Sequence, residues 1–175
     1  CIKADLYNLI DDKFGEKPTF NEEKFAKIVK DSIYALDEIL DYGYDSQPLD
    51  ENRTCIDNWR SLGLGLFGVA DALVAMKLRY GSEEANQLIG RVMKTMLLNA
   101  LRASCELAEK KGPFGHYRWE ATEKSPLIQM VKDLDPQLYS DIKKHGLRNC
   151  TLLSIDPTGP ISPLMGSFSG GCVPL

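Results

Sequence analysis

Apolar residues recur at helical spacing over most of this chain. Asn21 is a suitable N-cap, and the apolar positions that follow, up to Asp41, lie three and four residues apart, which predicts an amphipathic helix. Ser82 caps a longer predicted helix with acidic residues in its first turn, which ends in Lys110-Lys111 before Gly112. The predicted buried sides are Phe25, Ile28, Val29, Leu36, Ile39 and Leu40 in the first helix, and Leu88, Val92, Met96, Leu97, Ala100, Leu101 and Leu107 in the second.

The remaining pattern predicts further helices and few strands. Residues 125–145 favour two short helices separated by Pro136, and residues 45–58 are polar and rich in turn formers. The predicted buried side of the short helices is Leu127, Met130, Val131, Leu134, Leu138 and Ile142. Residues 151–155 are the main strand candidate, and residues 1–9 are a weaker one. So few strands cannot close a sheet unaided, which indicates a helix-rich α/β piece of a larger structure.

Three glycines lie in an apolar segment, residues 62–73. Gly63, Gly65 and Gly68 fit the GxGxxG pattern of dinucleotide-binding folds, but that pattern needs a preceding strand and an acidic residue after a second strand. Neither is visible. The same sequence pattern is explained by glycines that allow a helix to pack closely against a neighbour.

The segment after residues 151–155 has the composition of an anion-binding loop. Pro157 and Gly159 break the apolar run, and Pro160 suits the first turn of a new helix. Backbone N–H groups there, with the hydroxyls of Thr158 and Ser162, would form a phosphate site. An ordinary strand-to-helix turn with Ser or Thr caps is the alternative.

Composition excludes several classes of function. The chain has 175 residues, of which 43% are hydrophobic and 26% charged, which is typical of one globular domain. A net charge of -4 gives the chain no excess of basic residues with which to bind polymeric nucleic acid, although a small nucleotide remains possible as a ligand. The absence of a long apolar run or a signal segment predicts no membrane partner and a cytoplasmic location.

Five cysteines are scattered along the chain without a CxxC pair. The two histidines are not spaced to complete a zinc site with them, so the sequence predicts no metal site and reduced thiols. Cys105 lies on an apolar helical face and is predicted to be core. Cys1 and Cys172 lie near the two ends, where a redox role needs partners elsewhere.

Several segments together resemble the large, catalytic subunit of ribonucleotide reductases. The resemblance holds in order and spacing from about Phe20 onward, and the Pro-Thr-Gly wording is most similar to the adenosylcobalamin-dependent class. The segments that carry it are Arg60–Leu73, Tyr80–Ala85, Ala103–Ala108, Lys111–Phe114, Leu147–Asn149, Thr151–Leu153 and Pro157–Ser162.

The resemblance implies a fold and a chemistry. The family fold is a ten-stranded α/β barrel, so residues 1–175 are expected to form a single partial catalytic-barrel domain from its second half, incomplete at the N-terminus and at the C-terminus. Family members reduce ribonucleotides to 2'-deoxyribonucleotides for DNA synthesis through a cysteine thiyl radical. The implied radical source is adenosylcobalamin or, alternatively, a metal-containing partner subunit. The isolated chain is expected to hold no cofactor and to be inactive.

The resemblance also implies partners and site residues. The partners are a ribonucleoside di- or triphosphate, a thioredoxin- or glutaredoxin-type reductant, the rest of the catalytic subunit and a second copy. The residues that match the family's phosphate loop are Thr158, Gly159, Ile161 and Ser162. Cys1 matches the later cysteine of the reducing pair, whereas the thiyl cysteine and the other member of the pair are expected upstream.

Three positions depart from the family pattern. Pro160 replaces a common threonine, Val173 replaces a glutamate, and Asp156 replaces a small residue. A carboxylate beside phosphates would repel them unless it turned away or paired with a cation such as Arg148. A non-catalytic helical interaction or scaffold module derived from the same family is therefore the alternative function.

Overall fold

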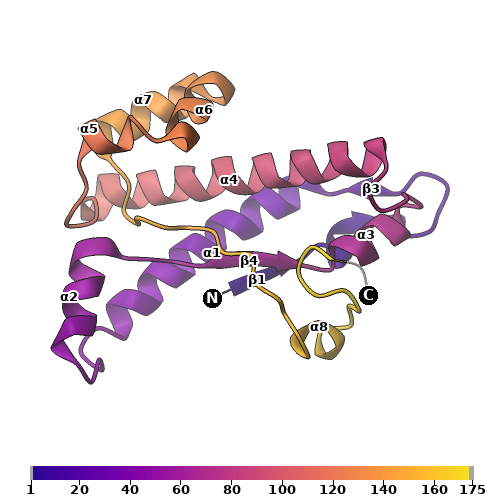
Figure 1. Ribbon diagram of the computed structural model, residues 1–175, viewed down its shortest axis with the longest axis horizontal. Coiled ribbons are helices and arrows are strands. Elements are labelled where there is room, and N and C mark those ends of the chain that lie inside the picture. The colour runs from indigo at the N-terminus through magenta and orange to yellow at the C-terminus, as the bar shows by residue number, and fades with distance from the viewer. Residues whose placement is uncertain (1, 174–175) are drawn as a thin grey trace. The chain divides into compact units, whose positions relative to one another are not determined.

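The computed structural model describes residues 2–173 of the chain (Figure 1). The chain divides into two compact units. The first unit comprises Cys1–Val29, Gly63–Leu97 and Leu153–Leu175, and the second comprises Lys30–Leu62 and Leu98–Leu152. Cys1, the predicted redox cysteine, lies outside the described residues.

Parallel strands form the centre of the first unit. Strand β1 (Ile2–Asp5) pairs in parallel with β4 (Leu64–Phe67), and Leu153 makes a single parallel bridge to Leu64. A separate antiparallel pair joins β2 (Ile10–Asp11) to β3 (Thr19–Phe20), after the short helix η1 (Tyr7–Leu9). The candidate strand at 1–9 is thus confirmed for residues 2–5, whereas residues 151–155 contribute only one bridge.

Strand β4 corrects the interpretation of the glycine-rich segment. Its residues are buried on both faces, so they show no alternation that would mark them as a strand. A Cβ at Gly65 would lie 2.6 Å from the carbonyl oxygen of Ser154, so this glycine permits close approach of two backbones in a sheet rather than helix packing. Gly68, with φ of 73°, is the N-cap residue of helix α3 (Val69–Ala75).

The two long helices are confirmed. Helix α1 (Glu22–Tyr42) is capped by Asn21, whose Oδ1 accepts from the N–H of Lys24 at 3.0 Å. Helix α4 (Glu83–Lys111) is capped by Ser82, whose Oγ accepts from the N–H of Ala85 at 3.2 Å. Most of the predicted buried sides are confirmed, including Phe25, Val29, Leu88, Val92, Met96, Ala100 and Leu101, but Ile39 is exposed.

The second unit contains four shorter helices. They are α2 (Asp50–Trp59), α5 (Trp119–Thr122), α6 (Pro126–Leu134) and α7 (Pro136–His145). The predicted break at Pro136 is confirmed, since Asp135 accepts from the N–H of Leu138 and caps α7. Helix α2 replaces most of the predicted turn-rich segment. The prediction of the buried side of α6 is partly wrong. Val131 and Ile128 are buried, but Leu127, Met130 and Leu134 are exposed.

The described residues form a helix-rich α/β structure. Between residues 2 and 173 the strands make two two-stranded sheets and no closed barrel. The last helix is a single turn, α8 (Ile161–Leu164), which starts after Pro160 as the sequence predicted. No helix in the described part of the chain is both long and apolar enough to cross a bilayer.

Candidate functional site

The candidate site lies in the first unit, in the segment that follows the Leu153 bridge. Because β1, β4 and Leu153 run parallel, the segments that leave these strands emerge at the same edge of the sheet. Ligands of open α/β sheets bind outside this carboxyl edge. Residues 156–162, which contain the predicted phosphate residues, form one of the segments that leave it.

The structure brings Thr158 and Ser162 together. Their hydroxyls form a hydrogen bond to each other, and both residues are buried. The N–H of Gly171 also donates to Thr158 Oγ1 at 3.2 Å, and the N–H of Ile161 donates to the carbonyl of Thr158 at 3.1 Å. The two hydroxyls therefore hold the loop in shape from within, while the Ile161 side chain is exposed.

Three backbone donors in this loop have no hydrogen-bond partner among the described residues. Among the hydrogen bonds between described residues, none uses the N–H of Thr158, Gly159 or Ser162 as donor. Gly159 adopts φ of 50°, and no atom lies within 4 Å of the position where its Cβ would be. Successive unpaired N–H groups in a glycine turn are a common way to bind an anion.

Asp156, just before the loop, forms an ion pair with Lys3 of β1. The Lys3 Nζ lies 2.9 Å from Asp156 Oδ2, and this hydrogen bond lowers the pKa of Asp156. Of the two possibilities left open by the sequence, that Asp156 turns away or that it pairs with a cation such as Arg148, the structure shows pairing with a cation, which is Lys3 and not Arg148. Lys3 was not singled out in the sequence, because only the parallel pairing of β1 with β4 brings it beside the segment that follows residue 153.

Arg148 belongs instead to a buried polar network in the second unit. Its Nε lies 3.6 Å from Asp37 Oδ2, and Arg60 donates to Asp37 Oδ1 from Nε and Nη2 at 3.0 and 2.7 Å. Asn149 donates to the same oxygen at 3.0 Å and is itself held by Ser104. Three of the residues that carried the family resemblance thus build structure in this unit: Arg60, Arg148 and Asn149.

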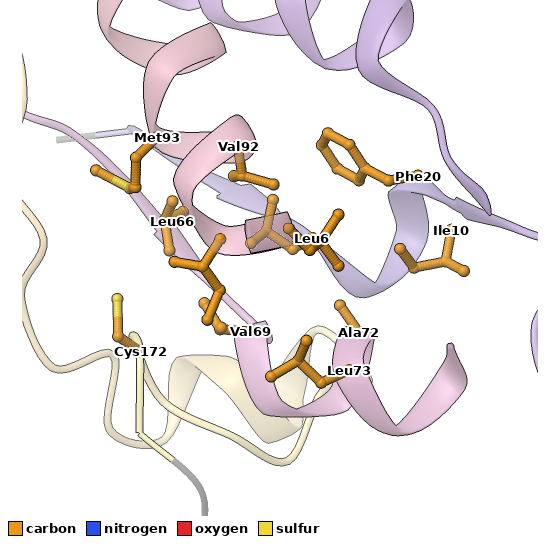
Figure 2. A pocket seen from close by; sticks show the side chains of 12 residues that line it. Leu6, Ile10, Phe20, Leu66, Val69, Ala72, Leu73, Val92, Met93 and Cys172 are labelled. Carbon is orange, nitrogen blue, oxygen red and sulfur yellow. The ribbon is translucent and has the colours of Figure 1, made fainter. Parts of the chain in front are cut away.

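The described cysteines show no paired or activated thiol. All four are free, and burial raises the pKa of Cys105 to about 11, which confirms that it is a core residue of low reactivity. Cys172 lies at the edge of an apolar cavity with Leu66 and Met93 (Figure 2), and burial raises its pKa as well. With no convergent polar group in its lining, this cavity is a gap in core packing rather than a substrate pocket.

Between residues 2 and 173, no group of three or more His, Cys, Asp and Glu side chains is arranged to hold a metal ion. The described residues therefore include no set of side chains to which a radical-generating metal centre can be assigned.

Comparison with known proteins identifies the family. Residues 5–175 match the model of the ribonucleotide reductase barrel domain. The chain is 33% identical over 155 residues to the ribonucleoside-diphosphate reductase large subunit of Caenorhabditis elegans, with 85% of this chain covered. It is 33% identical over 165 residues to the large chain of Cryptosporidium parvum and 31% identical over 159 residues to large chain 2 of Saccharomyces cerevisiae, covering 89% and 87% of this chain.

The chain matches only a part of the length of each of these relatives. The chain spans 19%, 20% and 18% of the length of these three proteins, or about a fifth. The family match nevertheless includes β4, both long helices and the loop at residues 158–162. The chain therefore belongs to the ribonucleotide reductase large-subunit family and corresponds to part of its barrel domain.

Proposed function

We propose that this chain forms part of a ribonucleotide reductase and carries the loop that holds the phosphates of the substrate. The match of residues 5–175 to the barrel domain of that family carries the proposal. Reduction of a ribonucleotide to a 2'-deoxyribonucleotide would then be the activity of the whole protein. The similar proteins are named ribonucleoside-diphosphate reductases, which favours a diphosphate over a triphosphate as substrate.

The proposed phosphate ligands are the backbone of residues 158–162 rather than the two hydroxyls alone. Thr158, Gly159 and Ser162 offer unpaired N–H groups, and the hydrogen bond between Thr158 and Ser162 keeps the turn closed. Pro160 supplies no donor but has a φ of -69°, which suits the first turn of α8. Ile161, the fourth predicted residue, would take part only by forming the start of that turn.

Asp156 is compatible with phosphate in this proposal because Lys3 neutralises it. An isolated carboxylate beside phosphate would oppose binding, but a carboxylate paired at 2.9 Å with an ammonium group presents little net charge. The pair would therefore remove the repulsion that the sequence predicts.

The remaining parts of the enzyme are proposed from the family alone. The parallel strands β1 and β4 would belong to a ten-stranded barrel completed by other residues, with residues 1–175 as a single partial domain, and Cys1 would be one cysteine of the reducing pair. The cofactor supplies the radical that starts the reaction. Because the similar proteins are named as large subunits and alpha subunits, a metal-containing partner subunit is favoured as its source over adenosylcobalamin. A thioredoxin- or glutaredoxin-type reductant, a second copy and a cytoplasmic location complete the proposal.

Two observations favour the alternative of a non-catalytic interaction module. The hydroxyls of Thr158 and Ser162 are occupied by each other, and Val173 stands where the family has a glutamate. The sequence upstream of residue 1 distinguishes the alternatives, since a cysteine flanked by the family's Asn and Glu supports the enzyme.

The phosphate proposal is tested by titrating the chain with a nucleoside diphosphate and following backbone amides by NMR. Amide shifts at Thr158, Gly159 and Ser162 are expected, and binding should weaken when Thr158→Val and Ser162→Ala are combined. A matched control, Thr54→Val with Ser46→Ala, changes two exposed hydroxyl residues of the second unit and should leave binding unchanged. Absence of any shift in the loop would refute the phosphate site.

A further inference from the structure

A second segment lies against the phosphate loop: Ser167–Gly171, here named the clasp. The N–H of Gly171 donates to Thr158 Oγ1 at 3.2 Å, and the N–H of Ser167 donates to the carbonyl of Ser162 at 3.0 Å. These two hydrogen bonds connect the ends of the clasp to the first and last residues of the loop. Any displacement of the clasp would therefore move both ends of the loop.

The clasp is held mainly by a carboxylate of helix α3. Asp71 Oδ2 accepts from the N–H of Ser169 at 2.8 Å, from its hydroxyl at 2.7 Å and from the N–H of Phe168 at 3.1 Å. The carbonyl of Ser169 in turn accepts from the N–H of Gly68 at 3.2 Å. Figure 1 shows this C-terminal segment, in yellow, beside α3.

A second carboxylate holds the other end of the clasp. Asp5, the last residue of β1, accepts from the hydroxyl of Ser167 at 3.1 Å and from the N–H of Tyr7 at 3.0 Å. Ser167 and Ser169 are both buried, whereas Phe168 between them is 68% exposed. Charge-assisted hydrogen bonds, and not apolar packing, therefore determine where the clasp lies.

The clasp also borders the unpaired donors of the loop. A Cβ at Gly170 would lie 3.1 Å from Thr158 Oγ1, and 3.7 and 3.8 Å from the backbone nitrogens of Thr158 and Gly159. Those two nitrogens carry unpaired N–H groups. The position of Gly170 therefore determines how much room an anion has beside them.

We infer that Asp71 is a positioning residue for the phosphate loop: it anchors the clasp, and the clasp orients Thr158 and Gly159 and forms the second wall of the anion site with Gly170. The inference deepens the proposed function and rests on it, since the ligand is a phosphate group. It adds to the site two elements distant in sequence, the end of β1 and the first turn of α3, and the nearby residues 167–171.

A purely structural role for Asp71 predicts a different result. A carboxylate in the first turn of α3 also stabilises that helix by interacting with its dipole. If this were its only role, its loss would lower the stability of the chain and leave the loop at residues 158–162 unaffected. Measurements at the loop itself therefore separate the two roles.

The test compares the 175-residue chain with its Asp71→Asn variant, using inorganic pyrophosphate as the probe. In the variant, amide hydrogen exchange at Ser169 and Gly171 should accelerate at least about tenfold, and the amide resonances of Thr158 and Gly159 should shift. Pyrophosphate affinity should fall about tenfold. The matched control, Glu16→Gln, removes an exposed carboxylate of the same unit and should change none of these values.

Two further variants keep the test decisive if Asp71→Asn folds poorly. Ser169→Ala removes one of the three hydrogen bonds to Asp71 and should give the same pattern at smaller size. Gly170→Ala leaves the anchor intact but places a methyl group against Thr158, so affinity should fall without faster exchange at Ser169.

The outcomes separate this inference from the phosphate proposal. Unchanged loop resonances and unchanged affinity in Asp71→Asn, with only reduced stability, would overturn the positioning role. If the unmodified chain binds no pyrophosphate, the phosphate proposal fails. The resonances of Thr158 and Gly159 and the exchange at Gly171 then still decide whether Asp71 orients the loop.

Discussion

At the scale of single residues, Gly65 and Gly68 meet two different physical needs. Gly65 lies in β4, where the carbonyl of Ser154 approaches too closely for any side chain, and Gly68 takes a left-handed conformation with Asp5 and Ser167 beside it. The sequence alone presented both as members of a GxGxxG pattern or as helix-packing glycines. Only the neighbouring chain segments decide between these interpretations, since a glycine carries no side chain whose pattern could indicate its role.

Replacing Gly65 by alanine is expected to destabilise the first unit by about 1–3 kcal/mol, because the new Cβ would force two backbones apart. Urea denaturation measures the free energy of unfolding. Gly90→Ala is the matched control: Gly90 is an exposed glycine inside α4 with no atom within 4 Å of its Cβ position. It should stabilise the chain by about 0.5–1 kcal/mol. Equal effects of the two changes would contradict the close approach at Gly65.

The Lys3–Asp156 pair predicts a pH dependence. Since Lys3 lowers the pKa of Asp156 in the folded chain, the pair stabilises the fold at neutral pH and loses its effect as pH falls through the lowered pKa. A carbon-13 titration of the Asp156 carboxyl should therefore have a midpoint below the ordinary value. In Lys3→Met the midpoint should rise, whereas Lys17→Met should not move it. A midpoint insensitive to Lys3 would show that the pair does not form in solution.

At the scale of elements, a buried network unites the second unit. Asp37 of α1 is fully buried and is surrounded by Arg60, Asn149 and Arg148, with Lys111 at 3.7 Å. Arg60 follows α2 in a left-handed conformation with φ of 45° and is itself buried. Arg60 also donates a hydrogen bond to the carboxylate of Asp41. Burial by itself would raise the pKa of Asp41, but the hydrogen bonds from Arg60 and Lys111 outweigh it, so the pKa is lowered. These contacts join α1, the end of α2, α4 and the segment after α7.

Arg60→Met is expected to cost about 3 kcal/mol of stability, because it leaves the Asp37 carboxylate buried with weaker partners. Thermal or urea unfolding measures the loss. The control is Arg53→Met in α2, which breaks the exposed pair with Asp50 and should cost less than about 1 kcal/mol. A loss at Arg60 no greater than that at Arg53 would show that the buried pair contributes nothing.

The helices whose buried side the sequence predicted best share one property, a single apolar stripe. Helices α1, α4 and α7 each bury one side, so their spacing was visible. Helix α2 has no buried residue and therefore no stripe, and β4 is buried on all four residues and therefore shows no alternation. On α6 the apolar residues occupy one broad side of which only a part is buried, so the pattern could not distinguish buried Val131 from exposed Met130.

At the scale of the whole molecule, the family match and the partial coverage of its relatives lead to one prediction. The 175-residue chain, supplied with a dithiol and a nucleoside diphosphate, should form no deoxyribonucleotide, because the proposal places the thiyl cysteine outside these 175 residues. A full-length large subunit with its radical source, assayed alongside, is the positive control. Product that depends on this chain would contradict the proposed division of the active site.

The sequence by itself determined the family and the two long helices with their caps, because these depend on local spacing and on short motifs, and it led to the proposal that residues 158–162 bind phosphate. The tertiary structure decided the rest. It paired Asp156 with Lys3 rather than Arg148, made Arg60 and Asn149 structural, and anchored the clasp to Asp71 and Asp5. Except for the pair of Arg60 with Asp37, each of these contacts joins residues that are between 89 and 162 positions apart in the sequence. The Lys3–Asp156 pair also depends on the register of β1 with β4. Such pairings follow from how the parallel strands and helices pack, which no local pattern of residues encodes.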